Sequence, residues 1–230
     1  MARPAGVAGS TRIVAVSEVF DCSDDERRAA GVAAAAASVL RGGLVVLCTD
    51  TVYGIGADAF RPGAIERMRG ARHQGIQAPV SVLVGSVRAA TALIEDLGPF
   101  GQQLIDEFWP GALTLVCRAA RSLQWDIGDT KGTVAIRMPG HPVALDLLAQ
   151  TGPMAVSGAN VAGSAAATTV AAAVEQFGDV VEVYLDGGPS EAAASSTVVD
   201  LTDGTPRLLR SGLIPIGRLR DVAAVAMVPD

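Results

Sequence analysis

The sequence predicts an α/β protein, an open, twisted, mixed sheet with flanking helices and a central concave crevice. Two observations support this prediction. Short apolar runs alternate with helical patterns along all 230 residues, and such alternation is typical of a mixed sheet covered by helices. Several apolar runs also end in clusters of polar residues. Strand ends of this kind commonly meet at the ligand-binding crevice of an open sheet.

Composition limits the kind of protein. Half of the residues are hydrophobic and 18% are charged, which is typical of a compact chain and not of a disordered one. No apolar run is long enough to cross a bilayer. The N-terminus shows no clear apolar segment ending in a cleavage site, so we expect a cytoplasmic protein. The net charge of −6 gives no general attraction to nucleic acid, and nothing in the sequence indicates the oligomeric state.

The cysteines and cations narrow the chemistry further. Cys22, Cys48 and Cys117 show no metal-ligand spacing, and His73 and His141 are not spaced as ligands of one metal. We therefore expect reduced structural thiols and no metal site formed by the protein alone. Because every cation except one lysine is arginine, a phosphate site would rely on guanidinium groups, backbone N–H groups and metal.

The first elements follow from caps and apolar runs. Ile13 to Val16 is a candidate edge strand. Ser23 to Glu26 predicts the start of a helix, because a capping residue precedes acidic residues. The alanine-rich run to Leu40 continues this helix, its alanines would let it lie close to the sheet, and Gly42 ends it. Leu44 to Leu47 then predicts a buried strand.

The same alternation continues to the C-terminus. Helical patterns occur at 62–72, 87–97, 102–108, 142–149 and 165–177, the last with Thr168 or Thr169 as its cap, and 218–225 is a candidate final helix. Strand patterns occur at 80–84, 113–117, 133–136, 154–156, 181–185, 197–201 and 207–209. We therefore divide the chain into an N-terminal extension (1–20), one α/β domain (21–212) and a C-terminal tail or helix (213–230).

Residues 44–58 are the most informative stretch. The predicted strand ends in small hydroxyl residues, a carboxylate and an aromatic: Thr49, Asp50, Thr51 and Tyr53. Gly54 and Gly56 follow, where the backbone can approach a ligand closely. A strand followed by an ordinary polar turn explains these residues equally well on local chemistry alone.

Seven segments, in order along the chain, resemble the motifs of the YrdC-like family, the threonylcarbamoyl-AMP synthases. They are Thr49–Gly56, Pro79–Val84, Trp109–Thr114, Gly132–Pro139, Ser157–Asn160, Ser196–Asp200 and Arg207–Arg210. The resemblance implies the fold of that family. It also implies that L-threonine, bicarbonate and ATP, with Mg²⁺, condense to threonylcarbamoyl-AMP and pyrophosphate. The product serves tRNA threonylcarbamoyladenosine formation, so tRNA or tRNA-modification proteins are candidate partners.

The resemblance also implies two sets of site residues. The L-threonine set is Thr49, Thr51, Tyr53, Arg137, Ser157 and Ser196. The ATP set is Arg72, Gln74, Thr133, Ala159, Asn160 and Arg210, with Arg72 as the catalytic residue. Without the resemblance, Arg137 and Arg210 also fit surface residues, and Ser157 to Asn160 fits a common turn. The reaction needs no general base because a carbamate oxygen is already an anion, so Asp50 could instead orient its loop or bind metal.

The chain departs from the family on the nucleotide side. The family's K-x-R motif falls on Arg72-His73-Gln74, which removes one positive charge, unless the register shifts to Arg67-Met68-Arg69. The family's S-A-N motif reads Gly158-Ala159-Asn160, and Arg69 or Lys131 would have to compensate for the lost charge. Two alternatives therefore stay open: a diverged paralogue acting on another amine or carbamoyl donor, and a non-catalytic module that binds RNA or a nucleotide.

Overall fold

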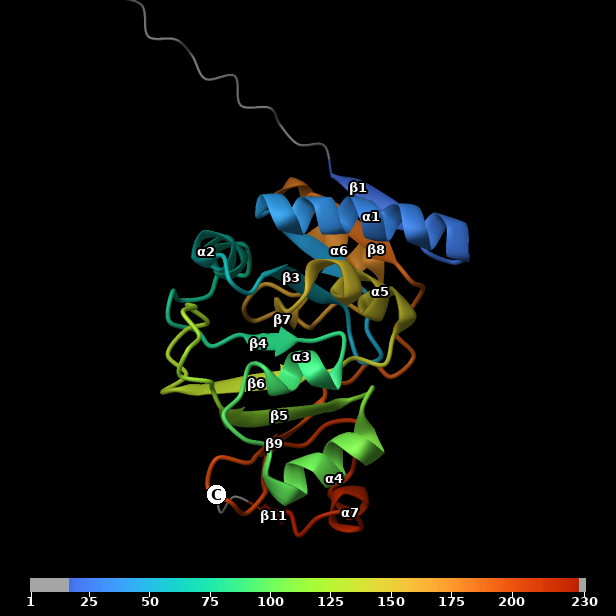
Figure 1. Cartoon of the computed structure of the whole chain (residues 1–230). Coiled ribbons are helices and arrows are strands. Elements are labelled where there is room, and N and C mark those ends of the chain that lie inside the picture. The colour runs from blue at the N-terminus through green and yellow to red at the C-terminus, as the bar shows by residue number, and fades with distance from the viewer. Residues whose placement is uncertain (1–16, 228–230) are drawn as a thin grey trace, which may run out of the picture.

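The computed structural model describes residues 17–227, which form a mixed sheet of 11 strands with helices packed on it (Figure 1). The spatial order of the strands is β1-β8-β2-β3-β7-β4-β6-β5-β9-β10-β11. Their bounds are β1 (Glu18–Asp21), β2 (Val45–Leu47), β3 (Gly54–Asp58), β4 (Ser81–Leu83), β5 (Leu113–Arg118), β6 (Thr133–Arg137), β7 (Met154–Gly158), β8 (Val183–Asp186), β9 (Thr197–Asp200), β10 (Arg207–Arg210) and β11 (Ala226–Met227). Parallel and antiparallel pairs both occur, so the predicted mixed α/β sheet is confirmed.

The bounds of the helices are α1 (Asp25–Arg41), α2 (Pro62–Ala71), α3 (Val87–Thr91), α4 (Gly98–Phe108), α5 (Pro142–Thr151), α6 (Val170–Phe177) and α7 (Ile216–Arg220), with a short 3₁₀ turn, η1 (Gly178–Val180). The predicted caps are found at the end of α1 and at the start of α6, and the N-terminal cap of α1 is Asp24, one residue after the expected Ser23. The Asp24 side chain accepts a hydrogen bond from the Arg27 N–H at the start of α1, and Gly42 ends that helix in the left-handed conformation. The Thr169 side chain caps α6 by accepting from the Ala172 N–H.

Strand β3 is the main element that the sequence pattern does not reveal. It pairs antiparallel with β2 and β7, although its sequence, Gly-Ile-Gly-Ala-Asp, shows no strand-like alternation of large apolar residues. A Cβ atom on Gly54 would lie 2.7 Å from the Val156 side chain, and one on Gly56 would lie 2.8 Å from the Met154 side chain. These two glycines therefore make room for side chains of β7, and Gly54 also lines the cavity described below.

Three predicted helices are shorter in the structure because their backbone groups bond elsewhere. In the range 165–177, the helix starts only at α6, since Ala167 exchanges hydrogen bonds with Tyr53 and Ala159. In the range 87–97, the helix stops at the end of α3, and the chain then bonds to the end of β5. The last helix, α7, ends before β11 pairs with β10.

The edges of the sheet hold the two ends of the described chain. Strand β1 pairs with β8 at one edge, so the expected boundary at residue 20 falls inside a sheet strand. At the other edge β11 pairs with β10. The candidate strand at 13–16 lies outside the described residues. Within residues 17–227, no helix is both long and apolar enough to cross a membrane.

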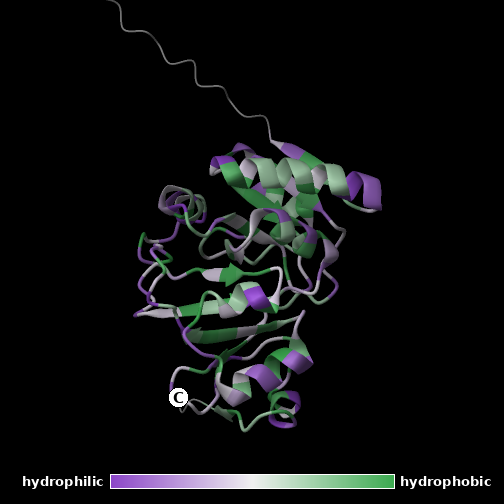
Figure 2. Ribbon diagram, in the orientation of Figure 1, coloured by the Kyte–Doolittle hydropathy of each residue, from purple (hydrophilic) through white to green (hydrophobic). Residues whose placement is uncertain are grey.

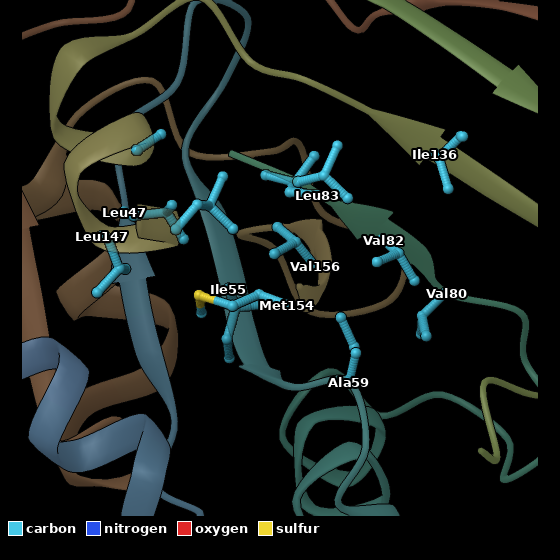
Figure 3. Close-up of a cluster of buried hydrophobic side chains, with 14 of the residues drawn as sticks. Leu47, Ile55, Ala59, Val80, Val82, Leu83, Ile136, Leu147, Met154 and Val156 are labelled. Atoms are coloured by element: carbon cyan, nitrogen blue, oxygen red, sulfur yellow. The ribbon is translucent and has the colours of Figure 1, made fainter. Parts of the chain in front are cut away.

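The hydrophobic core lies between the sheet and the helices that cover it. Hydrophobic residues dominate the strands, and hydrophilic residues gather on outer helix surfaces and loops (Figure 2). Figure 3 shows a buried cluster contributed by β2, β3, β4, β6, β7 and α5. Its labelled members are Leu47, Ile55, Ala59, Val80, Val82, Leu83, Ile136, Leu147, Met154 and Val156. This core supports the strand ends from which the candidate site is built.

The alanine face of α1 gives a test of how closely that helix packs. Ala35 is fully buried, whereas Ala37 on the same helix is exposed. Ala35→Leu is expected to lower the free energy of unfolding by about 1–3 kcal/mol, because overpacking a filled core forces side chains and backbone to shift. The matched control Ala37→Leu is expected to change it by less than about 0.5 kcal/mol. Urea unfolding measures both, and equal effects would contradict close packing of α1.

The three free thiols are all buried. Burial raises the pKa of Cys22 to about 11 and that of Cys48 and Cys117 to about 12. Only the thiolate reacts, and its population is very small at a pH well below the pKa. At pH 8 the native thiols are therefore expected to resist a disulfide reagent. All three are expected to react after unfolding in guanidinium chloride. The absorbance of the released reagent measures the reaction. Rapid reaction of the native protein would contradict the described burial of the thiols.

Candidate active site

A cavity of about 320 Å³ opens where the ends of several strands meet. Nine of the residues expected in the site line it: Thr49, Thr51, Tyr53, Arg72, Arg137, Ser157, Asn160, Ser196 and Arg210. They come from the turn between β2 and β3, the end of α2, and strands β6, β7, β9 and β10 or the residues next to them. The fold thus brings together residues that lie up to 161 positions apart in the sequence.

Arg137, at the end of β6, is the most constrained side chain in the cavity. It is buried, and its guanidinium donates to the Gly111 carbonyl at 2.9 Å, the Thr51 hydroxyl at 2.8 Å and the Asp50 carboxylate at 2.5 Å. The same Asp50 oxygen accepts from the Gly140 N–H at 2.8 Å. Asp50 therefore orients Arg137 and the loop after β6. One N–H remains without a described protein partner on each terminal nitrogen of Arg137.

The hydroxyl groups next to Arg137 form a hydrogen-bond chain with one direction. Arg137 can only donate to the Thr51 hydroxyl, and the Val52 carbonyl can only accept from the Thr49 hydroxyl, at 2.7 Å. The bond of 2.9 Å between the two hydroxyls must therefore run from Thr51 to Thr49. Thr49 also accepts from the Thr51 N–H. Both threonines are therefore held in place, and the Thr51 oxygen keeps one free acceptor site.

Arg210 and Ser196 form a second polar group on the facing wall. Arg210 donates to both the carbonyl and the hydroxyl of Ser196, at 2.9 and 3.0 Å. The Ser196 hydroxyl lies 2.7 Å from that of Thr114 on β5, and either can be the donor. Partial burial lowers the pKa of Arg210. Burial is the largest cause of the lowered pKa of Arg137, and the positive charge of Arg210 contributes to it.

Arg72, directly after α2, lies on the third wall and is buried. Its Nε donates to the carbonyls of Gly158 and Asn160, at 3.0 and 3.1 Å, and its terminal nitrogens donate to the side-chain oxygens of Gln74 and Asn160. Burial lowers its pKa, and its acceptors among the described residues are neutral carbonyl and amide oxygens, with no carboxylate among them. A buried cation without a counter-ion is costly unless a ligand supplies the negative charge.

The structure places four expected residues differently from the simplest expectation. Tyr53 borders the cavity, but its hydroxyl donates to the Gly188 carbonyl at 2.7 Å, away from a ligand. Gln74 does not line the cavity and instead accepts from Arg72. Thr133 stands at the far end of β6 from Arg137 and donates to the Thr130 carbonyl. Ala159 is fully buried, and its N–H donates to the Tyr53 carbonyl.

Residues outside the two predicted sets also line the cavity. They are Val52, Gly54, Pro79, Ser81, Leu83, Thr114, Val156, Gly158, Ala166 and Ser195. Among them, Gly54 is the expected point of close backbone approach, and Gly158 and Ser195 belong to polar segments expected at the site. Ser81 and Thr114 could have been identified as site residues because each is a hydroxyl residue inside an otherwise apolar strand. Neither Arg69 nor Lys131 lines the cavity, so neither replaces the cation that the family motif has at position 74. The lining contains three arginines and no carboxylate.

Comparison with known proteins places the fold and site in one family. The chain belongs to the Sua5/YciO/YrdC family, whose model, described as "Telomere recombination", matches residues 38–212. A Mycobacterium leprae relative is 51% identical over 213 residues, covering 93% of this chain and 97% of the relative. The threonylcarbamoyl-AMP synthase of Pyrococcus abyssi is 34% identical over 81% of this chain, which spans only 55% of that enzyme.

A solved structure agrees with this assignment. The crystal structure of P. abyssi Sua5 complexed with L-threonine superposes with a TM-score of 0.83 at 29% identity. The match covers 91% of this chain and 63% of that chain. The predicted family and the predicted YrdC-like fold are therefore confirmed.

The Asp50–Arg137 pair gives a test of the site's architecture. Asp50→Ala would leave the buried guanidinium without its carboxylate and free the Gly140 N–H. It is expected to lower the free energy of unfolding by about 1.5–3 kcal/mol, since the Asp50 side chain is only 22% exposed. The control is Asp146→Ala, which breaks the Asp146–Arg28 pair, where the carboxylate is 51% exposed, and it should cost at most about 1 kcal/mol. Equal losses in urea unfolding would contradict a special role for Asp50.

Proposed function

We propose that this chain is an L-threonylcarbamoyladenylate synthase, which joins L-threonine, bicarbonate and ATP and releases pyrophosphate. The observation that carries the proposal is the charge of the cavity. Three guanidiniums line it, only that of Arg137 is paired with a carboxylate, and Arg72 is buried with neutral oxygens as its described acceptors. Each proposed reactant contributes negative charge: the α-carboxylate of threonine, bicarbonate and the triphosphate. Family membership and the L-threonine complex of P. abyssi Sua5 support the same substrates.

The wall around Arg137 suits the amino acid. The two free N–H groups of Arg137 suit a carboxylate, which a guanidinium holds best with paired, charge-assisted hydrogen bonds. Ser157 and Ser195 line the same cavity, and their hydroxyls have no described side-chain partner. Leu83 and Val156 also line it and would contact the methyl group of threonine. The part of the cavity around Arg72 and Asn160 is then the place for the nucleotide phosphates.

The proposed chemistry balances without a protein base. The threonine amine and bicarbonate give a carbamate and water. A carbamate oxygen then attacks the α-phosphorus of ATP, and the bond from that phosphorus to the bridging oxygen breaks as pyrophosphate leaves. The carbamate is already an anion, and Asp50 is engaged by Arg137 and Gly140. Catalysis therefore rests on positioning and on neutralising the charge of the phosphates.

Mg²⁺ fits this site as a partner of ATP. Among residues 17–227 no group of three or more histidine, cysteine or acidic side chains could hold a metal ion. The lining does offer hydroxyl oxygens, which suit a hard cation such as Mg²⁺. The triphosphate would supply the charged ligands, and the metal would supply further neutralisation of the phosphates. We propose that the product passes, in the cytoplasm, to tRNA or a tRNA-modification protein, which uses it to form threonylcarbamoyladenosine.

Turnover tests the proposed function directly. Pyrophosphate release is expected to require L-threonine, bicarbonate and ATP–Mg²⁺ together. Arg72→Ala is expected to lower kcat/KM for ATP roughly tenfold to a hundredfold, because it removes a charged contact to phosphate. Faster turnover with another amine or with carbamoyl phosphate would support the diverged paralogue instead. RNA binding without any pyrophosphate release would support the non-catalytic module.

Gly212 gives a second test of the site geometry. A Cβ atom at Gly212 would lie 2.4–2.5 Å from backbone atoms of Ser195 and Ser196, so Gly212→Ala must shift that turn. Because displacements of about 1 Å can cost on the order of a hundredfold in rate, kcat/KM for threonine should fall at least tenfold. The control is Gly217→Ala, since a Cβ there meets no atom within 4 Å. Steady-state kinetics decides, and unchanged kinetics in Gly212→Ala would count against Ser196 as a site residue.

A further inference from the structure

Arg69, in the last turn of α2, is an unusual arginine because it is only 2% exposed although it does not line the cavity. Its Nε donates to the Ala78 carbonyl at 2.9 Å. One terminal nitrogen lies 3.8 Å from a carboxylate oxygen of Asp126, and the other is buried without a partner among the described residues. A buried guanidinium with so few partners is costly. Its contacts must therefore provide something that the fold or the site needs.

The contacts of Arg69 hold both ends of one loop. Its own carbonyl accepts the Gln74 N–H at 2.9 Å, and its side chain holds the Ala78 carbonyl four residues later. The residue after Ala78 is Pro79, which lines the cavity. Proline has no N–H, so the Ala78 carbonyl is the group through which this end of the loop can be held next to the cavity.

A second loop closes over the same guanidinium. The Gly128 backbone has φ of +99°, and a Cβ atom there would lie 2.9 Å from the unpartnered nitrogen of Arg69. The two loops are also joined by backbone hydrogen bonds from Val80 to Ile127 and from Asp129 to Gln77, both of 3.0 Å. Figure 1 shows the loop after α2 and the loop before β6 together at one edge of the molecule.

The held loop connects directly to the phosphate side of the site. Gln74, whose N–H bonds to Arg69, accepts through its side chain from Arg72. Loss of the loop's geometry would therefore move one of the four acceptors that hold Arg72, together with Pro79 on the cavity wall. The amino-acid side is independent of the loop, because Arg137 is held by Gly111, Thr51 and Asp50.

We propose that Arg69 is a positioning residue for the reaction, because its side chain and carbonyl fix loop 74–78 and thereby place Arg72 for the nucleotide phosphates. This inference rests on the proposed function. It gives this role to a buried cation that lies outside the cavity and belongs to neither predicted set of site residues. The structure also offers a matched control on the same helix. Arg67 likewise holds one backbone carbonyl, that of Gly42, but at the end of α1.

The test compares Arg69→Met, Arg69→Lys and Arg67→Met with the wild-type chain. Titration calorimetry gives the dissociation constants of ATP–Mg²⁺ and L-threonine, and hydrogen–deuterium exchange follows the peptides covering residues 73–80. Arg69→Met is expected to weaken ATP–Mg²⁺ at least tenfold, to leave the threonine constant within about twofold, and to accelerate exchange in that loop. Arg69→Lys is expected to keep most of the ATP–Mg²⁺ affinity and most of the slow exchange in the loop, since one donor suffices for the Ala78 carbonyl. Arg67→Met should change neither ligand constant.

The possible failures are distinguishable. If wild-type chain releases no pyrophosphate, the proposed function fails; if wild-type chain is active but Arg69→Met binds ATP–Mg²⁺ normally, the role of Arg69 fails. Equal weakening of ATP–Mg²⁺ and threonine, with faster exchange throughout the chain, would also overturn the proposal, because it would show a general loss of stability. Changed loop exchange with unchanged ATP binding would overturn it as well, since the loop would then not control Arg72.

Discussion

The hydrogen-bonded ion pair between Asp50 and Arg137 is the interaction on which the rest of the site depends. Arg137 joins the end of β6 to the turn after β2 through Thr51 and Asp50, and to Gly111 before β5. Asp50 extends the same connection to Gly140. Segments that are distant in sequence are therefore held in one geometry. The hydroxyl of Thr51 accepts from Arg137 and donates to Thr49, because the only proton of the Thr49 hydroxyl goes to the Val52 carbonyl.

The same pair divides the electrostatics of the cavity into two parts. Around Arg137 the charge is compensated by Asp50, so under the proposed function this wall would bind the carboxylate through its two remaining N–H groups. Around Arg72 the charge has no described partner, and its acceptors are neutral carbonyl and amide oxygens. A phosphate oxygen bound there would supply the missing counter-ion. The sequence departure at Gln74 fits this division, because the amide holds Arg72 in place and adds no charge.

Much of the fold and of the site could be predicted because the signals are local. The caps of α1 and the order of the motifs can be seen in the sequence, and nine expected site residues do share one cavity. The remainder depends on tertiary contacts. Strand β3 is formed by glycines that fit the side chains of β7, the Tyr53 hydroxyl bonds to Gly188, which lies 135 residues later, and Thr133 lies at the end of its strand away from Arg137. The local sequence does not show which neighbour a side chain contacts or at which end of a strand the site lies.

The measurement that tests the account most directly compares the binding of L-threonine and L-threoninamide to the wild-type chain by titration calorimetry. The two ligands differ at the group that Arg137 is proposed to hold. The account predicts that threonine binds and that the amide binds roughly tenfold to a hundredfold more weakly, since a charge-assisted hydrogen bond is lost. Equal affinity for both ligands, or binding of neither, would contradict the assignment of Arg137 to the carboxylate and with it the central claim about this cavity.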